Sequence, residues 1–147
     1  MSKDNNTIFK LYVEASKEQP QIVEDADGNK RWYLHNKLHR EDGPAIEHVS
    51  GYKAWYLHGK LHRENDPAVV YTDGYKAWYL HGERHREDGP AIEYVNGDKA
   101  WWLHGRRYKG AQSWARALLK SKSEPSGKKD VDAFLHNLNK KRVNDLM

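Results

Sequence analysis

The feature that most constrains this chain is a tryptophan that recurs every 23 residues. Four tryptophans share the spacing: Trp32, Trp55, Trp78 and Trp101. Each is followed by an aromatic residue, a leucine and a histidine, and three of the four segments continue through His-Arg-Glu to a Pro-Ala pair. A fixed period of this length is the signature of a repeat protein, in which each unit packs mainly on its neighbours.

Three turn signals divide each unit into short strands. The first is a dipeptide ending in glycine before the tryptophan: Asp27-Gly28, Ser50-Gly51, Asp73-Gly74 and Asn96-Gly97. The second lies four residues after the tryptophan: Asn36, Gly59, Gly82 and Gly105. The third precedes a proline, which cannot donate a hydrogen bond to a sheet: Gly43, Asp66 and Gly89. This order predicts a hairpin, a second tight turn and a joint in every unit.

The first turn signal also predicts a strand register. Asp-Gly and Asn-Gly favour the two-residue type I′ turn, whose two central residues both have positive φ. Counting outward from such a turn places a β-branched residue opposite each tryptophan. We therefore predict a structural core made of these pairs: Val23 with Trp32, Ile46 with Trp55, Val69 with Trp78 and Ile92 with Trp101.

These patterns predict a mainly β fold, an elongated repeat array of antiparallel β-hairpins with a C-terminal α-helical cap. Residues 1–19 are expected to form an N-terminal cap segment, with a strand or helical turn over residues 7–15. The array covers residues 20–110, as a half repeat followed by units that start near Trp32, Trp55, Trp78 and Trp101. Apolar spacing and a Ser-Gly-Pro stretch predict a capping helix over 111–121, a linker over 122–129 and a basic amphipathic helix over 130–147. That second helix either packs on the first or awaits a partner.

The charge is unevenly placed along the chain. The net charge is +4, and residues 111–147 hold 8 basic and 4 acidic side chains, so the whole excess lies in this tail. The chain has no cysteine, no apolar signal core at its N-terminus and no run of about 18 apolar residues, which favours a cytoplasmic protein without a membrane span.

The repeat resembles the MORN repeat, in the Trp-Tyr variant found in bacteriophage, large-virus and antitoxin-like bacterial proteins. The shared features are the 23-residue period, the glycine before the aromatic strand, the Trp-Tyr pair and the glycine four residues after the tryptophan, over about residues 20–110. Where the family usually has His-Gly-Xaa-Gly, this chain has His-Arg-Glu-Asp-Gly-Pro, so the lipid binding ascribed to some members transfers poorly. The resemblance implies a scaffold or partner-binding surface and no reaction.

Strand alternation predicts where a partner would bind. The residue after each tryptophan points to the opposite side of its strand. These residues form an aromatic stripe: Tyr33, Tyr56, Tyr79 and Trp102. Three arginines recur at the same step, and we expect them beside the stripe, although the second turn leaves their side open: Arg40, Arg63 and Arg86. Because aromatic and arginine side chains dominate interface energies, we predict that both sets contact a protein partner.

The repeated polar residues predict neither catalysis nor a bound metal. Equivalent histidines of successive units are expected about 10–15 Å apart, too far to share one ion. The Arg-Glu pairs recur in every unit, whereas an active site is a single constellation. We therefore expect no enzyme, cofactor or metal. The resemblance to the Trp-Tyr repeat variant implies a phage-encoded inhibitor or modulator of a host defence protein, which is the function we favour. One alternative is an antitoxin-like partner of a toxin. The other is a nucleic-acid or nucleotide binder that uses the stripe and five basic tail residues: Lys128, Lys129, Lys140, Lys141 and Arg142.

Overall fold

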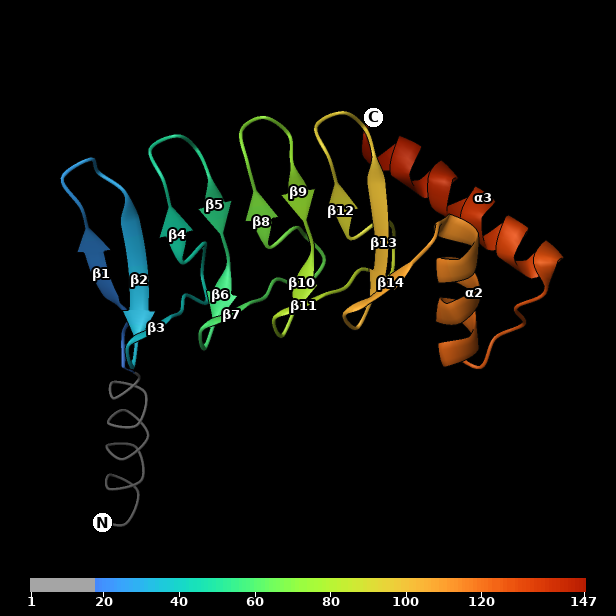
Figure 1. Cartoon of the computed structure of the whole chain (residues 1–147), viewed down its shortest axis with the longest axis horizontal. Helices are drawn as coiled ribbons and strands as arrows, with labels where there is room; N and C mark the ends of the chain where they lie inside the picture. Colours follow the sequence, from blue (N-terminus) through green and yellow to red (C-terminus); the bar gives the residue numbers. More distant parts are fainter. Residues whose placement is uncertain (1–17) are drawn as a thin grey trace, which may run out of the picture.

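The computed structural model describes residues 18–147 and has the mainly β fold that the repeat predicts (Figure 1). Antiparallel hairpins stand side by side along the long axis of the molecule, and two helices close the C-terminal end. The predicted fold class, a hairpin array with a helical cap, is therefore confirmed. The strand or helical turn predicted over residues 7–15 lies outside the described residues.

One continuous sheet links all the units. Its strand order is β1-β2-β4-β5-β8-β9-β12-β13-β14, with β3 paired to β2. The strands are β1 (Gln21–Glu24), β2 (Lys30–Leu34), β3 (Lys37–Leu38), β4 (Ile46–Glu47), β5 (Lys53–Ala54), β8 (Val69–Val70), β9 (Lys76–Ala77), β12 (Ile92–Glu93), β13 (Lys99–Leu103) and β14 (Arg106–Tyr108). Two short hairpins complete the middle units: β6 (Tyr56–Leu57) with β7 (Lys60–Leu61), and β10 (Tyr79–Leu80) with β11 (Glu83–Arg84).

The predicted register is wrong by one residue. Ile46 lies opposite Ala54, Val69 opposite Ala77 and Ile92 opposite Ala100, so none of the three faces a tryptophan. In the first hairpin Ile22 lies opposite Trp32, and Val23, opposite Arg31, is 49% exposed. Because side chains alternate between the two sides of a strand, this shift separates the four predicted β-branched partners from their tryptophans.

The cause is a three-residue turn where a two-residue turn was predicted. The backbone N–H of His48 donates to the Tyr52 carbonyl, and that of Gly51 donates to His48, which leaves three residues in the loop. Only the glycine has positive φ, 89° at Gly51, as in a type I turn followed by a glycine bulge. The same glycine signal serves both turn types, so the dipeptide alone does not fix the register.

The second turn signal forms the two-residue turn. His58 and Gly59 connect β6 to β7 and have φ values of 50° and 80°, the pattern of a type I′ turn. The turn recurs in every unit, with His35-Asn36, His81-Gly82 and His104-Gly105 at the same place. The tight turn predicted at this position is thus present, with a histidine as its first residue.

The tryptophans occupy one side of the array, which we call the tryptophan side. The guanidinium carbon of Arg40 lies 4.0 Å from the centre of the Trp32 ring, that of Arg63 3.9 Å from Trp55 and that of Arg86 3.7 Å from Trp78. Trp32 and Trp78 are buried, while Trp55 and Trp101 are half-buried. The rings of Trp32, Trp55 and Trp78 are therefore each covered by a cation from their own unit, and a cation on an aromatic face is attractive.

The opposite side, which we call the tyrosine side, carries the β-branched core. Buried Ala54, Val69, Ala77, Ile92 and Ala100 form one cluster, with half-buried aromatic residues packed on it. Val69 and Ile92 are thus core residues as predicted, Ile46 packs against them, and Val23 is not part of the core. The predicted single core is in fact two layers of side chains on the two sides of a thin sheet.

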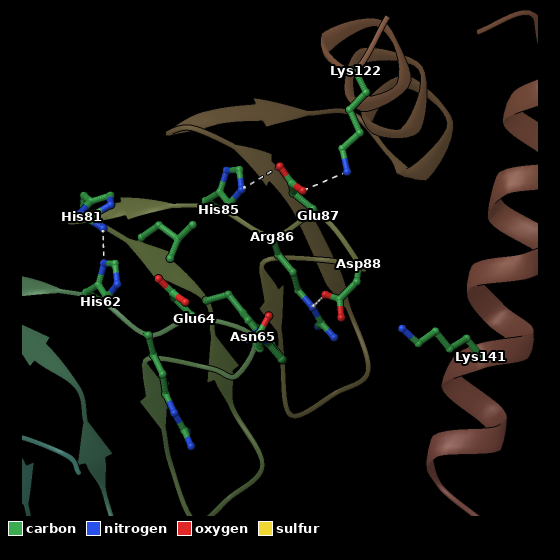
Figure 2. A pocket seen from close by; sticks show the side chains of 13 residues that line it. His62, Glu64, Asn65, His81, His85, Arg86, Glu87, Asp88, Lys122 and Lys141 are labelled. Carbon is green, nitrogen blue, oxygen red and sulfur yellow. Dashed lines mark hydrogen bonds and ion pairs between the residues drawn. The ribbon is translucent and has the colours of Figure 1, made fainter. Parts of the chain in front are cut away.

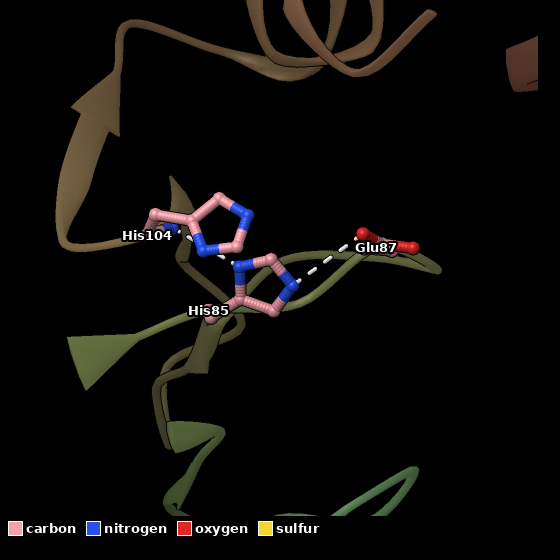
Figure 3. A group of neighbouring side chains, drawn as sticks. All are labelled: His85, Glu87 and His104. Carbon is pink, nitrogen blue, oxygen red and sulfur yellow. Dashed lines mark hydrogen bonds and ion pairs between the residues drawn. The ribbon is translucent and has the colours of Figure 1, made fainter. Parts of the chain in front are cut away.

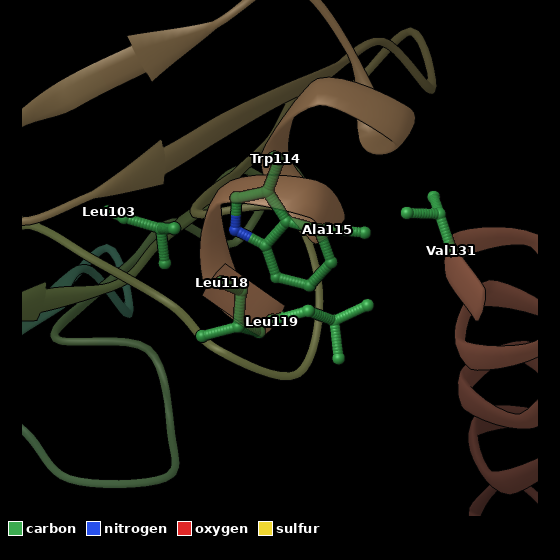
Figure 4. Close-up of a cluster of buried hydrophobic side chains, with 6 residues drawn as sticks. All are labelled: Leu103, Trp114, Ala115, Leu118, Leu119 and Val131. Atoms are coloured by element: carbon green, nitrogen blue, oxygen red, sulfur yellow. The ribbon is translucent and has the colours of Figure 1, made fainter. Parts of the chain in front are cut away.

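Helices α2 (Ala111–Ser121) and α3 (Lys128–Asp145) close the array at the last unit. The ring of Trp114 lies 4.8 Å from that of Trp101, and its indole N–H donates to the Arg86 carbonyl at 3.1 Å. Trp114 therefore covers Trp101, the fourth tryptophan. In this unit Lys109 stands at the position that holds the covering arginine in the other three. Figure 4 shows the cluster around Trp114, in which Val131 of α3 is fully buried. Of the two arrangements left open for α3, the structure has the packed one.

No helix among residues 18–147 combines the length and the apolar composition needed to cross a membrane.

Candidate functional site

An open groove lies on the tyrosine side, at the tips of the β8–β9 and β12–β13 hairpins. It has a volume of about 640 Å³. Its walls are mainly aromatic and aliphatic, apart from Asp73 and Asn96. The other lining residues are Tyr52, Val69, Tyr71, Tyr75, Ala77, Tyr79, Tyr94 and Val95. We call this surface the tyrosine groove.

Four of these tyrosines form a row that crosses the strands. The ring centres of Tyr52 and Tyr71 are 4.7 Å apart, those of Tyr71 and Tyr75 5.5 Å, and those of Tyr75 and Tyr94 5.8 Å. The last two pairs meet edge to face, at 80° and 68°. Tyr71 and Tyr94 remain 46% and 43% exposed. The row is ordered by ring contacts yet leaves two rings open to a ligand.

The hydroxyls of Tyr52 and Tyr75 remain protonated near pH 7, because their pKa values are raised. Burial raises the pKa of Tyr52 to about 12 and raises the pKa of Tyr75 above its ordinary value, and the neighbouring tyrosines add to both effects. A protonated phenol both donates and accepts a hydrogen bond. The Tyr79 hydroxyl accepts a hydrogen bond from the Arg84 guanidinium at 3.0 Å, so its own proton points elsewhere.

The groove has one charged residue. Among the described residues that line it, Asp73 is acidic and none is a lysine, arginine or histidine. The backbone N–H of Tyr75 donates to the Asp73 carboxylate at 3.0 Å, which fixes the carboxylate at the hairpin tip. The site therefore favours a neutral or cationic ligand over an anionic one.

The structure places the predicted aromatic stripe only partly in this groove. Tyr79 lines the groove, whereas Tyr56 and Trp102 are half-buried against the core cluster beside it. Tyr33 lies in the first unit, away from the groove. The three arginines expected beside the stripe lie on the opposite side of the array, because each one stacks on the tryptophan of its own unit: Arg40, Arg63 and Arg86.

Sequence reasoning missed Tyr52, Tyr71, Tyr75 and Tyr94. A signal was present in the alternation of the strands. Tyr71 follows Val69 by two residues and Tyr75 precedes Ala77 by two, and Val69 pairs with Ala77. Both tyrosines therefore lie on the same side of the hairpin as Val69 and Ala77. The predicted two-residue turn shifts one strand of each hairpin by one residue against the other. With that register the two tyrosines of a hairpin fall on opposite sides, so the row was not predicted.

The histidines meet in pairs across the joints between units, and each pair joins different positions of the repeat, not the equivalent histidines that were expected to lie about 10–15 Å apart. The ring centres of His85 and His104 are 4.2 Å apart, and those of His39 and His58 4.4 Å. In each pair the backbone N–H of the later histidine donates to Nδ1 of the earlier one, at 3.0 Å for both. His62 and His81 repeat the arrangement at 3.1 Å. These histidines therefore join neighbouring units.

In the described part of the chain, one cluster brings three potential metal-ligating residues together, His85, Glu87 and His104 (Figure 3). Their ligand atoms lie within 4.8 Å of one another. However, Nδ1 of His85 accepts the His104 N–H, so the proton of the neutral ring sits on Nε2, 3.7 Å from Glu87. Binding a metal through Nε2 would move that proton to Nδ1, where it would face the N–H donor. The cluster thus suits a joint between units better than a metal.

The same joint lowers the basicity of its histidines. Burial lowers the pKa of His85, and His104 adds to the effect, while Glu87 and Glu83 oppose it. Burial also lowers the pKa of His62, with a further contribution from His81. Both rings are therefore neutral near pH 7, which preserves the Nδ1 acceptor.

A second cavity of about 570 Å³ lies between the tryptophan side and the helical cap (Figure 2). Several of its charges are paired: Arg86 binds Asp88 at 2.7 Å and Lys122 binds Glu87 at 3.2 Å. Lys141 of α3 points into the same space. Opposite charges alternate around this cavity, so it shows no preference for one ligand charge.

The basic tail does not form one surface. Arg142, one of the predicted nucleic-acid contacts, donates to Glu93 at 2.8 Å. Lys128 and Lys140 belong to the same helix but are separated by about 18 Å along its axis, at 1.5 Å per residue. The helix therefore holds its cations at two ends, with one of them bound to the array.

Fold and site together define an elongated β-hairpin repeat protein with a tyrosine-lined groove on one side and a helical cap at one end. Comparison with known proteins finds no matching family model, no matching curated protein and no matching solved structure.

Proposed function

We propose that this chain is a non-enzymatic binding module that captures a protein partner in the tyrosine groove. The observation that carries the proposal is the row of tyrosines, in which Tyr71 and Tyr94 are held by ring contacts but are about half exposed. Tyrosine is enriched among the residues that dominate protein interfaces, and rings that are already ordered lose little freedom on binding.

The repeated chemistry elsewhere supports a binding role over a catalytic one. The histidine pairs recur at the joints between units, and the Arg-Asp pairs recur within units, where the arginines cover tryptophan rings. An active site needs one set of groups that is free to act on a substrate. The proposal therefore assigns these polar groups to the scaffold and the groove to the partner.

The 23-residue period and its likeness to Trp-Tyr MORN repeats support a more specific proposal for the partner. In this proposal the chain is phage-encoded and acts in the host cytoplasm as an inhibitor of a host defence protein. An inhibitor needs a rigid surface and no chemistry of its own, which suits a repeat array.

A capture experiment with three forms of the whole protein tests the proposal. The immobilised wild type, Tyr71→Ala/Tyr94→Ala and Tyr33→Ala are exposed to bacterial lysate, and bound proteins are quantified by mass spectrometry. We expect a protein enriched by the wild type and by Tyr33→Ala to be lost with the double variant. Equal enrichment by the double variant would contradict the groove assignment, and loss with Tyr33→Ala would favour the stripe predicted from the sequence.

A further inference from the structure

The strands that line the tyrosine groove are interior strands. β8 pairs with β5 and β9, and β12 pairs with β9 and β13, so both backbone edges of each strand are hydrogen-bonded. A ligand therefore cannot bind here by adding a strand, which is one of the common modes of peptide recognition. Recognition must come from the tyrosine rings and hydroxyls.

The ring arrangement suits a ligand with a ridged apolar surface. Tyr71 and Tyr75 meet at 80° and Tyr75 and Tyr94 at 68°, so the row presents ring faces and ring edges in turn. A polyproline II segment has three residues per turn, packs proline rings on aromatic-lined grooves, and leaves its carbonyls without internal hydrogen bonds. Tyrosine hydroxyls in the groove can donate hydrogen bonds to such carbonyls.

The length of the row matches a short segment. Neighbouring ring centres are 4.7, 5.5 and 5.8 Å apart. Since a polyproline II helix rises about 3.1 Å per residue, the row spans roughly five residues.

The charge of the groove selects the flanking residues. The Asp73 carboxylate is fixed at the tip of the β8–β9 hairpin, and the described lining residues include no cation, while Arg84, which is not among them, donates to the Tyr79 hydroxyl. A lysine or arginine beside the prolines would meet Asp73, while a glutamate or a phosphate would meet repulsion.

From these observations we infer that the tyrosine groove binds an extended proline-rich segment of about five residues that carries a lysine or arginine. This inference rests on the proposed protein-binding function and adds the chemistry of the bound segment. Binding of this kind needs no change in the array, because every hydrogen bond of the interior strands is kept.

Peptide titration tests the inference directly. The probe is a fluorescein-labelled peptide of eight prolines with an arginine at each end, and fluorescence polarisation follows its binding to the whole protein. We expect this probe to bind saturably. A control peptide with glycine and serine in place of the prolines should have a Kd about tenfold higher, which corresponds to about 1.4 kcal/mol of binding free energy. A third peptide, with glutamate in place of arginine, is also expected to bind more weakly.

Matched variants locate the binding. Tyr71→Ala/Tyr94→Ala is expected to weaken the proline–arginine probe at least about tenfold, while Tyr33→Ala leaves it unchanged. Asp73→Asn keeps an acceptor for the Tyr75 N–H and removes the charge, so it should weaken the arginine probe severalfold and leave an uncharged proline probe unaffected. Circular dichroism of each variant verifies that the array is folded.

The outcomes separate this inference from the proposed function. Absence of probe binding, or equal binding of the glycine–serine peptide, overturns the proline-rich ligand. If lysate capture still depends on Tyr71 and Tyr94 in that case, the groove binds a protein segment of another conformation, and the proposed function stands. If neither the probe nor a lysate protein depends on these two tyrosines, both proposals are wrong.

Discussion

The tryptophan side and the tyrosine side of the array share one 23-residue period but use it differently. On the tryptophan side every ring has a fixed cover, an arginine in three units and Trp114 in the last. On the tyrosine side the hairpin tips change from unit to unit. One tip position holds Asp25, His48, Tyr71 and Tyr94, and the other holds Asn29, Tyr52, Tyr75 and Asp98. The comparison indicates that packing fixes one side of the repeat, while the other is free to form a site.

The second arginine provides a comparison within the tryptophan side. Arg40 and Arg86 each bind an aspartate and a glutamate, and their side chains are 21% and 11% exposed. Arg63 has Val70 where the others have glutamate and Asp66 where the others have glycine, and it is 30% exposed. The cover over Trp55 is therefore the weakest of the three, which ranks the effects of substitution along the array.

The largest expected effect is on the tryptophan side. We expect Trp78→Ala to reduce the free energy of unfolding by about 3–5 kcal/mol, because it empties a large buried site. Trp55→Ala should cost less, since Trp55 is only half-buried under Arg63. Urea denaturation measures both, and equal losses would show that the covers are equivalent.

The next effect concerns the arginine covers. Arg86→Lys keeps the charge but loses the planar group that lies 3.7 Å from the Trp78 ring and binds Asp88, Glu93 and the Pro90 carbonyl. We expect a loss of about 1.5–3 kcal/mol in unfolding free energy, as for hydrogen bonds to charged groups. Arg63→Lys is the matched control and should lose less. A larger loss for Arg63→Lys would contradict the ranking of the covers.

The joints between units should make stability depend on pH. The pKa values of His62 and His85 are lower in the folded protein than the ordinary value of 6.5, so the unfolded chain takes up protons first as the pH falls. Their contribution is complete above pH 6.5 and is lost as the pH falls through the folded pKa values. We expect unfolding in urea to need less denaturant at pH 5.5 than at pH 7.5.

A variant at His85 isolates this effect from that of the carboxylates. His85→Asn retains an oxygen acceptor near the position of Nδ1 and removes the titration, so its loss of stability between pH 7.5 and 5.5 should be smaller than in the wild type. An identical pH dependence in the two proteins would assign the acid sensitivity to other groups.

The smallest effect is expected on the tyrosine side. Tyr94→Ala should change the free energy of unfolding by less than about 0.5 kcal/mol, because the side chain is 43% exposed. Combined with Tyr71→Ala, it should nevertheless abolish partner capture. A destabilisation as large as that of Trp78→Ala would make the tyrosine row part of the core and would remove the contrast between the two sides.

The sequence predicts the period, the hairpins and the first capping helix, whose predicted range 111–121 coincides with α2. These features depend on local signals, such as glycine turns and apolar spacing. The register failed because a glycine after Asp, Ser or Asn suits a two-residue and a three-residue turn alike. This one-residue difference in turn length decides which residues share a side of the hairpin with each aromatic ring. The tyrosine groove could therefore not be predicted without the strand register, even though all its tyrosines can be read from the sequence.

The joints described above also have a consequence for evolution. The backbone bonds that join the units, such as Arg40 N–H to the Tyr56 carbonyl and Arg63 N–H to the Tyr79 carbonyl, recur with the same spacing. A duplication of one 23-residue segment would thus insert a unit whose bonds to both neighbours already exist. Duplication of a segment that carries Tyr71 and Tyr75 would lengthen the tyrosine row by two rings. In this architecture, the number of repeat units would set the length of the proposed binding surface, without remodelling of the fold.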